Sequence, residues 1–244
     1  MKSLRDIVLI YLPCLFLVGS FSWVMAYKFV PVRWTPLMLK RQIENASQDD
    51  YRRQQIWVSK EDISPLLIDA VLLAEDQRFY QHKGFDVIEL KSMTRAYRQG
   101  ESSLRGCSTI SQQVAKNCFT FGGRSWWRKA VESYYTILIE LLWSKDRILE
   151  IYLNIAETGP GLFGMEAACQ QYFHLSSADI SISDAAALAC VLPQPLARTP
   201  QNIFHSFAHK HAQLAKSLGL LGHHIDIHYK QHCHQLQKWS NKMR

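Results

Sequence analysis

The sequence predicts a mainly α-helical fold that follows one N-terminal transmembrane helix, and three features of the chain lead to this prediction. Residues 7–27 contain no charged side chain and are long enough to cross the hydrocarbon core of a bilayer as a helix. Later segments repeat apolar residues at helical spacing, with turn-forming glycines and prolines between them. Alternation typical of half-buried strands is scarce. We therefore expect helices to build nearly all of the fold.

The composition fits one packed domain with an apolar appendage. The 244 residues are 48% hydrophobic and 20% charged, which excludes a disordered chain. Lys and Arg total 28 against 21 Asp and Glu, a net charge of +7, so we expect an anionic partner such as a phospholipid or a pyrophosphate. Nucleic acid is disfavoured because the chain has no compact Lys/Arg run and no zinc-finger spacing of Cys and His.

The six cysteines are scattered and form no C-x-x-C pair. This spacing argues against a structural zinc site and against a small disulfide scaffold. We expect buried free thiols, with a disulfide between Cys107 and Cys118 as the alternative in an oxidising compartment.

The residues around the apolar segment bear on its orientation. Lys2 and Arg5 precede it, and Trp23 and Tyr27 near its far end suit the interfacial aromatic belt. We place the N-terminus in the cytoplasm and the bulk of the chain outside, although basic residues from Lys28 onward also follow the span. A cleaved signal peptide is the alternative, disfavoured because the apolar stretch is long and no A-x-A site ends it.

The pattern divides the chain into an anchor over 1–30, a juxtamembrane linker over 31–59, a folded domain over 60–200 and a His-rich tail over 201–244. In the tail His228 and His232 have the helical spacing of a metal pair, but a solvated or membrane-surface tail is the preferred interpretation. Within the domain we expect helices from Pro65 and over Ser108–Asn117, Trp126–Trp143, Lys145–Asn154, Gly164–Phe173 and Ser183–Leu192.

The first segment with chemical potential runs from Glu75 to Gly84. Glu75 and Asp76 end an apolar helix and meet a loop that contains Phe79 and His82. A carboxylate partly withdrawn from water has a raised pKa, as a general base that works near neutrality needs. Taken alone the signal is weak, because acid pairs at helix ends are usually solvated and loop histidines usually support the fold.

The second segment is an amide-rich helix that begins at Ser108 or Thr109. Its N-terminus offers free backbone N–H groups and the positive end of the helix dipole to an anion. The polar residues of one face are Ser108, Gln112 and Lys116, with Gln113 and Asn117 beside them. A solvated polar face is the alternative, and we favour phosphate binding because this face carries amides and a cation but no carboxylate.

The third segment, Arg124–Glu132, is strongly basic. Alone it is typical of an ordinary surface ion pair, since Arg128 and Glu132 lie at i, i+4 and Lys129 and Glu132 at i, i+3. Beside the second segment, Lys116, Arg124 and Lys129 would clamp a pyrophosphate, while Glu132 would hold a divalent ion or orient a cation. A fourth segment over 145–168 has apolar residues typical of a core and glycines typical of backbone corners.

In this order the segments resemble the family 51 glycosyltransferases, the module that polymerises peptidoglycan. The motifs are E-D-x-x-F-x-x-H-x-G from Glu75, G-x-S-T-I-[ST]-Q-Q-x-x-K-N from Gly106, R-K-x-x-E from Arg128 and K-x-x-I-L-E-x-Y-L-N from Lys145. Asp184–Ala189 with Pro193-Gln194-Pro195 resembles the fifth motif. Cys107 stands where glycine is common, and the resemblance fades beyond Thr199. With one span and no penicillin-binding domain, the chain looks like the monofunctional branch of the family.

The resemblance implies a lysozyme-like fold whose cleft opens at the membrane, and an enzyme that polymerises lipid II into glycan strands. Glu75 would be the general base that takes the proton from the acceptor 4-hydroxyl, with inversion and release of undecaprenyl pyrophosphate. Glu132 would work with Mg²⁺ or Mn²⁺ or position the cations. Lys116, Arg124 and Lys129 would neutralise the leaving group.

The resemblance also implies binding and supporting roles. Ser108, Gln112, Gln113 and Asn117 would hydrogen-bond the leaving group or the sugars. Asp76, Phe79, His82 and Gly84 would support the first motif. The chain is expected to cross the bacterial inner membrane once, with its domain in the periplasm. Its partners would be lipid II, the growing strand and cell-wall synthesis proteins, with no nucleic acid.

Two other functions fit parts of the pattern. A muramidase on the same scaffold would use Glu75 as a general acid, and it would not need the cationic, amide-lined face from Ser108 to Lys129. A non-catalytic membrane-tethered scaffold would keep the site only as a docking surface, and the intact set of charged residues argues against it.

Overall fold

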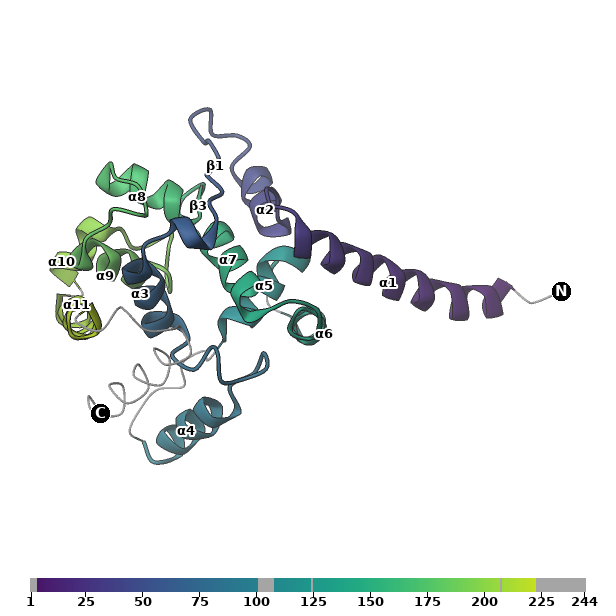
Figure 1. The fold of residues 1–244 in the computed structure, drawn as a ribbon. Coiled ribbons are helices and arrows are strands. Elements are labelled where there is room, and N and C mark those ends of the chain that lie inside the picture. Colours follow the sequence, from purple (N-terminus) through teal and green to yellow (C-terminus); the bar gives the residue numbers. More distant parts are fainter. Residues whose placement is uncertain (1–3, 101–107, 124, 207, 223–244) are drawn as a thin grey trace.

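The computed structural model describes residues 4–100, 108–123, 125–206 and 208–222, and this part of the chain is mainly helical. Figure 1 shows one long helix, α1, that projects from a cluster of shorter helices. The predicted fold class, mainly α with one N-terminal apolar helix, is confirmed.

The shorter helices follow α1 (Leu4–Phe29) along the chain. They are α2 (Pro36–Glu44), η1 (Lys60–Asp62), α3 (Pro65–Glu75), α4 (Val87–Arg98), α5 (Ile110–Phe119), α6 (Trp126–Leu142), α7 (Lys145–Ile155), α8 (Met165–Phe173), α9 (Ile182–Val191), α10 (Pro200–Ser206) and α11 (Ala208–Gly222). Three short strands, β1 (Gln54–Gln55), β2 (Glu157–Gly159) and β3 (Leu162–Phe163), form a sheet in the order β1-β3-β2.

Helix α1 contains a stretch, Tyr11–Phe29, that is long and apolar enough to cross a membrane. Its C-terminal half packs on the domain. The hydroxyls of Ser20 and Tyr134 are hydrogen-bonded at 2.7 Å, and the indole N–H of Trp143 donates to the carbonyl of Val24 at 3.0 Å. The helix is therefore docked against α6 and does not hang from a free tether.

The end of α1 is held by a side chain from α7. The guanidinium of Arg147 donates to the carbonyl of Tyr27 at 2.7 Å and to that of Val30 at 2.5 Å. The last carbonyls of a helix have no intrahelical partner, so this arginine satisfies groups that would otherwise need water. The domain and α1 are thus joined by polar as well as apolar contacts.

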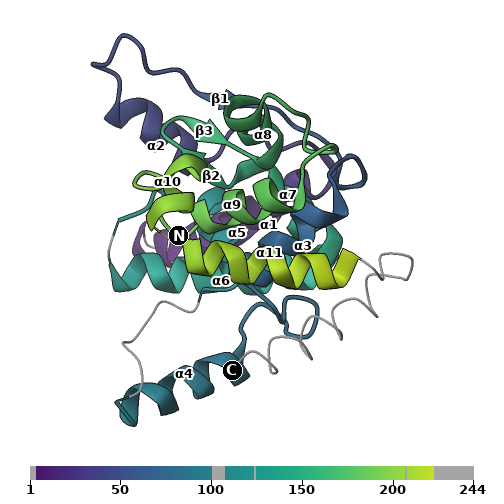
Figure 2. The ribbon, with the colours of Figure 1, turned by 90° about the vertical axis from the view of Figure 1, so that its left-hand side faces the viewer.

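The core forms where α3 packs on α9 and where α5 packs on α6 and α7. Residues 67–73 of α3 are all buried, so this helix is apolar nearly all round, as central helices are. Figure 2 shows α11 lying across α9 and α3, and these three helices contact one another. The C-terminal end of α3 therefore lies among α5, α11 and the loop that leads to α4.

The segment expected to be a linker, 31–59, is part of the fold. It carries α2 and β1, and Met38 of α2 is fully buried. The guanidinium of Arg41 makes a bidentate ion pair with Glu157, at 2.7 and 2.9 Å. Strand β1 pairs in parallel with β3.

The ordered helices also continue past residue 200, where the sequence analysis ends the domain. Leu214 and Leu218 of α11 are buried against the neighbouring helices. His228 and His232 lie outside the described residues.

The expected helices within the domain are confirmed as α3 and α5 to α9, with shifts of one or two residues at their ends. Helix α4 was missed from the sequence, and no buried residue of its own holds it in place, since Val87, Leu90 and Tyr97 are exposed. Instead, the Asp86 side chain starts it by accepting the backbone N–H groups of Ile88 and Glu89 at 3.1 and 2.9 Å. Cys118 and two later cysteines are buried free thiols as expected, while Cys107 lies outside the described residues.

The buried ion pair between α2 and β2 gives a test of this packing. Arg41→Met would leave the buried Glu157 carboxylate unpaired and cost about 3 kcal/mol, roughly 6 °C or more of melting temperature. Lys40→Met on the same helix removes only the half-exposed pair with Glu44 and should cost less than about 1 kcal/mol. Thermal unfolding of the full chain in detergent measures both, and equal shifts would contradict the structural role of Arg41.

Candidate active site

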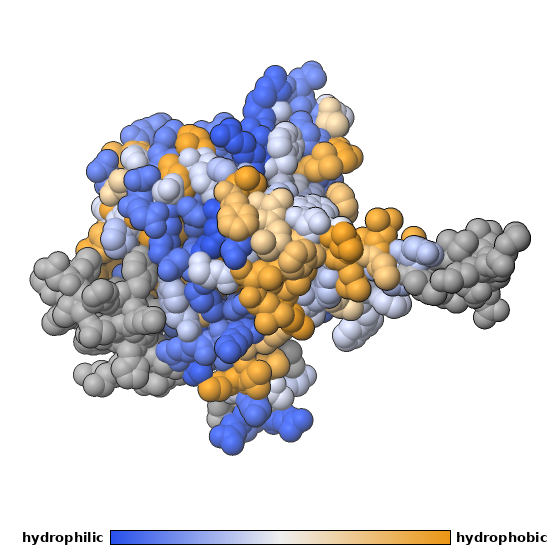
Figure 3. Space-filling view, turned by 45° about the vertical axis from the view of Figure 1, so that its right-hand side comes forward, coloured by the Kyte–Doolittle hydropathy of each residue, from blue (hydrophilic) through white to orange (hydrophobic). Residues whose placement is uncertain are grey.

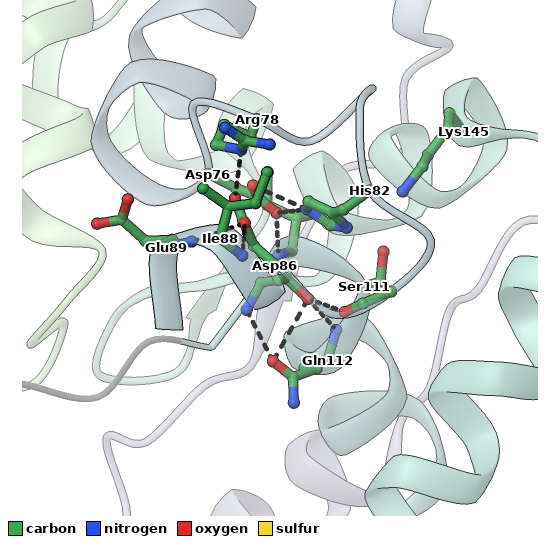
Figure 4. A network of polar contacts seen from close by, with 12 residues as sticks. Asp76, Arg78, His82, Asp86, Ile88, Glu89, Ser111, Gln112 and Lys145 are labelled. Carbon is green, nitrogen blue, oxygen red and sulfur yellow. Dashed lines mark hydrogen bonds and ion pairs between the residues drawn. The ribbon is translucent and has the colours of Figure 1, made fainter. Parts of the chain in front are cut away.

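Helix α3 ends at Glu75 because Asp76 leaves the helical conformation, with φ −159° and ψ 78°. The Asp76 carboxylate then ties two further segments to this point (Figure 4). It accepts hydrogen bonds from His82, whose Nε2 atom lies 3.0 Å from each carboxylate oxygen, and from the backbone N–H of Ile110 at 2.9 Å. The end of α3, the loop after it and the first turn of α5 are thus joined by one buried side chain.

The loop between Asp76 and Gly84 is packed onto α6 and α7. Phe79 is buried, and the Lys145 ammonium lies 4.4 Å from the centre of its ring. Gly84 has φ +87°, and an added Cβ would lie 2.8 Å from Cγ2 of Thr136. Only glycine permits both this backbone conformation and this close approach.

Glu75 lies opposite Gln113 of α5. The Gln113 side-chain N–H donates to Oε2 of Glu75 at 2.6 Å. The Tyr152 hydroxyl donates to the Gln113 carbonyl oxygen at 3.3 Å. Burial raises the pKa of Tyr152 well above its ordinary value, so the hydroxyl stays protonated and fixes the orientation of the Gln113 amide.

The charge state of Glu75 results from opposing effects. Burial raises the pKa of its carboxyl above the ordinary value. The hydrogen bond from Gln113 and the positive charges of Lys210 and Lys116 act in the opposite direction. The result is a carboxylate that holds a proton more readily than a solvated glutamate does, as a general base near neutrality requires.

A cationic cluster lies beside Glu75. Glu132 of α6 is only 2% exposed. Its carboxylate forms ion pairs with the Arg128 guanidinium, at 2.6 Å, and with the Lys129 ammonium. Burial lowers the pKa of Lys116, while the charge of Glu132 raises it and those of Arg128 and Lys129 lower it. Lys116 also interacts with Glu75, so its ammonium is within electrostatic reach of both carboxylates.

This arrangement places a proton acceptor next to a surplus of positive charge. The charge of Lys116 acts on the Glu75 carboxylate and on the cluster in which Arg128 and Lys129 share the single carboxylate of Glu132. Such a site can take a proton from a neutral nucleophile and, a short distance away, stabilise a departing anion.

Comparison with known proteins agrees with this chemistry. The transglycosylase family model matches residues 40–218. A biosynthetic peptidoglycan transglycosylase of Haemophilus influenzae is 45% identical over 183 residues, which cover 74% of each protein. Relatives of the same name from Salmonella paratyphi B and Salmonella enteritidis are each 48% identical over 175 residues, 71% of this chain and 72% of theirs.

The chain belongs to the transglycosylase family. It is therefore a glycosyltransferase with a lysozyme-like domain. The match begins inside α2 and ends inside α11, so parts of both helices fall within the transglycosylase domain.

The structure places the other residues of the amide-rich helix in different surroundings. Ser108 is exposed, one residue before the N-cap Thr109. Gln112, expected to bind substrate, instead completes a capping box, in which its Oε1 accepts the Thr109 N–H at 3.1 Å. Asn117 is buried, and its Oδ1 has no hydrogen-bond partner within the described residues. Arg124 lies outside the described residues.

The residues around Glu132 do not fit a protein-held Mg²⁺ or Mn²⁺. Both oxygens of Glu132 are occupied by Arg128 and Lys129, and Lys116 adds a further positive charge. A hard divalent ion needs several oxygen ligands. The described part of the chain holds no group of three His, Cys, Asp or Glu side chains that could bind a metal.

Three residues of the site were not singled out for these roles from the sequence. Tyr152 was assigned to the core, and only its place in the fourth motif could have marked it. Arg128 was treated as a surface ion-pair residue, yet it contacts the buried Glu132. Lys210 lies in the His-rich segment, on helix α11, which packs on α3 and α9, and its charge acts on both Glu75 and Cys190.

The raised pKa of Glu75 predicts a pH-dependent effect on stability. Because the folded-state pKa exceeds the unfolded one, ionisation of Glu75 costs stability as pH rises through the folded-state value. Glu75→Gln should therefore raise the melting temperature at pH 8 by roughly 2–4 °C, and the gain should vanish near pH 4. Glu61→Gln, at an exposed site, should change neither value. Equal shifts at both pH values would refute this account of Glu75.

Proposed function

We propose that this transglycosylase polymerises lipid II into peptidoglycan strands, by inverting transfer with release of undecaprenyl pyrophosphate. The observation that carries the proposal is the partly buried Glu75 carboxylate, held by Gln113 and adjoining Lys116 and the Glu132 cluster. The names of the relatives from Haemophilus influenzae and Salmonella support the choice of peptidoglycan.

In the proposed reaction Glu75 acts as the general base. The 4-hydroxyl of the acceptor sugar attacks the anomeric carbon of the donor while Glu75 takes the hydroxyl proton. Oε2 is held by Gln113, and Oε1 has no hydrogen-bond partner in the described part of the chain, so Oε1 is the oxygen that faces the acceptor. The new glycosidic bond forms as the bond from the anomeric carbon to the pyrophosphate oxygen breaks, and configuration inverts.

The cations stabilise the leaving group. Pyrophosphate departs as an anion, so the reaction needs no protonated acid of the kind that a glycosidase uses. Lys116, Arg128 and Lys129 supply positive charge where the negative charge develops. Asn117 offers its unpartnered Oδ1 to a sugar hydroxyl or amide. No step in this mechanism uses a divalent ion held by the protein.

The proposal includes a membrane location. Helix α1 would cross the bacterial inner membrane with its N-terminus in the cytoplasm and the domain in the periplasm, where lipid-linked precursors meet the wall. Its docking on α6 and α7 supports this location, because it holds the domain at the membrane surface. Cell-wall synthesis proteins are the protein partners expected there.

The first test is polymerisation by the purified full chain in detergent with labelled lipid II. Wild type should lengthen the glycan, and Glu75→Gln should reduce turnover by about 10²-fold or more while Glu61→Gln does not. Folding of each variant is checked by its melting temperature.

Other products of this assay would contradict the proposal. Shortening of finished peptidoglycan strands would indicate that the enzyme is a muramidase. A folded chain that binds lipid II without polymerising it would indicate a non-catalytic scaffold. Full turnover by Glu75→Gln would contradict the assignment of Glu75 as the general base.

A second test uses Lys210. Its positive charge lowers the pKa of Glu75, so Lys210→Met should raise that pKa and move the acidic limb of the kcat/KM profile to higher pH. Lys216→Met removes an exposed charge from the same helix and should leave the limb in place. Lys210→Arg should restore the wild-type limb, and coincident limbs for wild type and Lys210→Met would rule out this contribution of α11.

A further inference from the structure

The basic residues at and after the C-terminal end of the span form two groups. Lys40 and Arg41 are explained by the fold, because they pair with Glu44, and Arg41 also pairs with Glu157. The remaining cations have no carboxylate partner among the described residues. They are Lys28, Arg33, Arg52 and Arg53, and with Trp34 we call them the juxtamembrane cationic surface.

Arg53 is the centre of this surface. Its guanidinium stacks on Trp34, 4.0 Å from the ring centre, and donates to the carbonyl of Arg33 at 3.2 Å and to Gln55 at 3.1 Å. Burial lowers the pKa of Arg53, so the cation is partly withdrawn from water. A cation in these surroundings, without a carboxylate in the described chain, is suited to an external anion.

The surface lies at the end of α1. The span ends at Phe29, which is 72% exposed and has the Lys28 ammonium 5.5 Å from its ring centre. Trp34 is 50% exposed. Figure 3 shows apolar side chains gathered where α1 leaves the domain, with hydrophilic side chains beyond them. Exposed aromatic residues next to cations are typical of the headgroup layer of a bilayer.

The acidic residues of the loop before Arg52 form no ion pair with these cations. Asp49 and Asp50 lie in the same loop, and neither forms an ion pair within the described residues. Arg52 instead donates to the backbone carbonyls of Asp49 and Tyr51, at 2.9 and 3.1 Å. The surface therefore keeps a positive excess that the fold of the described chain does not use.

We propose that the juxtamembrane cationic surface binds the phosphate groups of anionic phospholipids in the leaflet at the C-terminal end of α1. Guanidinium groups bind phosphate through paired N–H donors, and Trp34 holds Arg53 in place for this contact. The inference rests on the proposed span by α1, and it does not depend on the proposed chemistry at Glu75. It also accounts for the basic residues that weaken the charge asymmetry across the span.

The test measures lipid preference with the full chain in phosphatidylcholine vesicles that contain trace nitroxide-labelled phosphatidylglycerol or phosphatidylcholine. Electron paramagnetic resonance gives the association constant of each labelled lipid. Wild type should prefer phosphatidylglycerol by about threefold or more, and salt should weaken the preference. Carbonate extraction of the same vesicles shows separately whether the chain is integrally inserted.

Variants that remove positive charges test which part of the chain produces the preference for phosphatidylglycerol. The triple variant Arg33→Gln, Arg52→Gln, Arg53→Gln should bring the two association constants close to equality. A control with the same charge change removes cations of α4, which Figure 1 places on the other side of the domain from α2. This control, Lys91→Gln with Arg95→Gln and Arg98→Gln, should keep the wild-type preference.

Several outcomes would overturn the proposal. They are equal association constants in an integrally inserted wild type, an undiminished preference in the Arg33, Arg52 and Arg53 variant, or an equal loss in the control. Displacement of labelled phosphatidylglycerol by a few molecules of undecaprenyl pyrophosphate per protein would assign the surface to substrate. Extraction of the chain by carbonate would instead contradict the span, whatever the activity at Glu75.

Discussion

The carboxylate of Asp76 is the contact on which the geometry of the site depends. It accepts hydrogen bonds from His82 in the following loop and from the first backbone N–H of α5, so three segments meet at one buried side chain. This contact fixes the end of α3 against α5, and thereby sets Glu75 opposite Gln113. A buried carboxylate without these donors would be costly, so the loop and α5 must close around it together.

The second constraint is electrostatic. The site holds Glu75 and Lys116 in surroundings that disfavour both charges. Glu75 is stabilised first by Gln113 and then by Lys210 and Lys116, and Lys116 is stabilised first by Glu132 and then by Glu75. Such groups respond strongly to a change in a neighbour because water screens them little. In the proposed reaction, the deprotonated base acts at the acceptor and the cluster of cations acts at the leaving pyrophosphate of the donor.

Site residues could be predicted from the sequence where they recur at helical spacing within one segment. They could not be predicted where contacts between distant segments determine which side chains meet. Spacing placed Lys116 on the polar face of one helix with Gln113 beside it, and in the structure Gln113 hydrogen-bonds Glu75 and the charge of Lys116 acts on it. The same spacing could not show that Gln112 turns back to cap its own helix. Nor could it place Lys210, since only the packing of α11 on α3 and α9 brings that charge to a glutamate far away in the chain.

The central claim is that Glu75 is the base and that Gln113 stabilises its ionised form. The most direct measurement is the pH dependence of kcat/KM for lipid II polymerisation by wild type and Gln113→Leu. Loss of the 2.6 Å hydrogen bond should raise the pKa of Glu75 and move the acidic limb to higher pH, whatever the fall in the maximum rate. Acidic limbs that coincide, in two folded proteins, would contradict the assignment of Glu75 as the base.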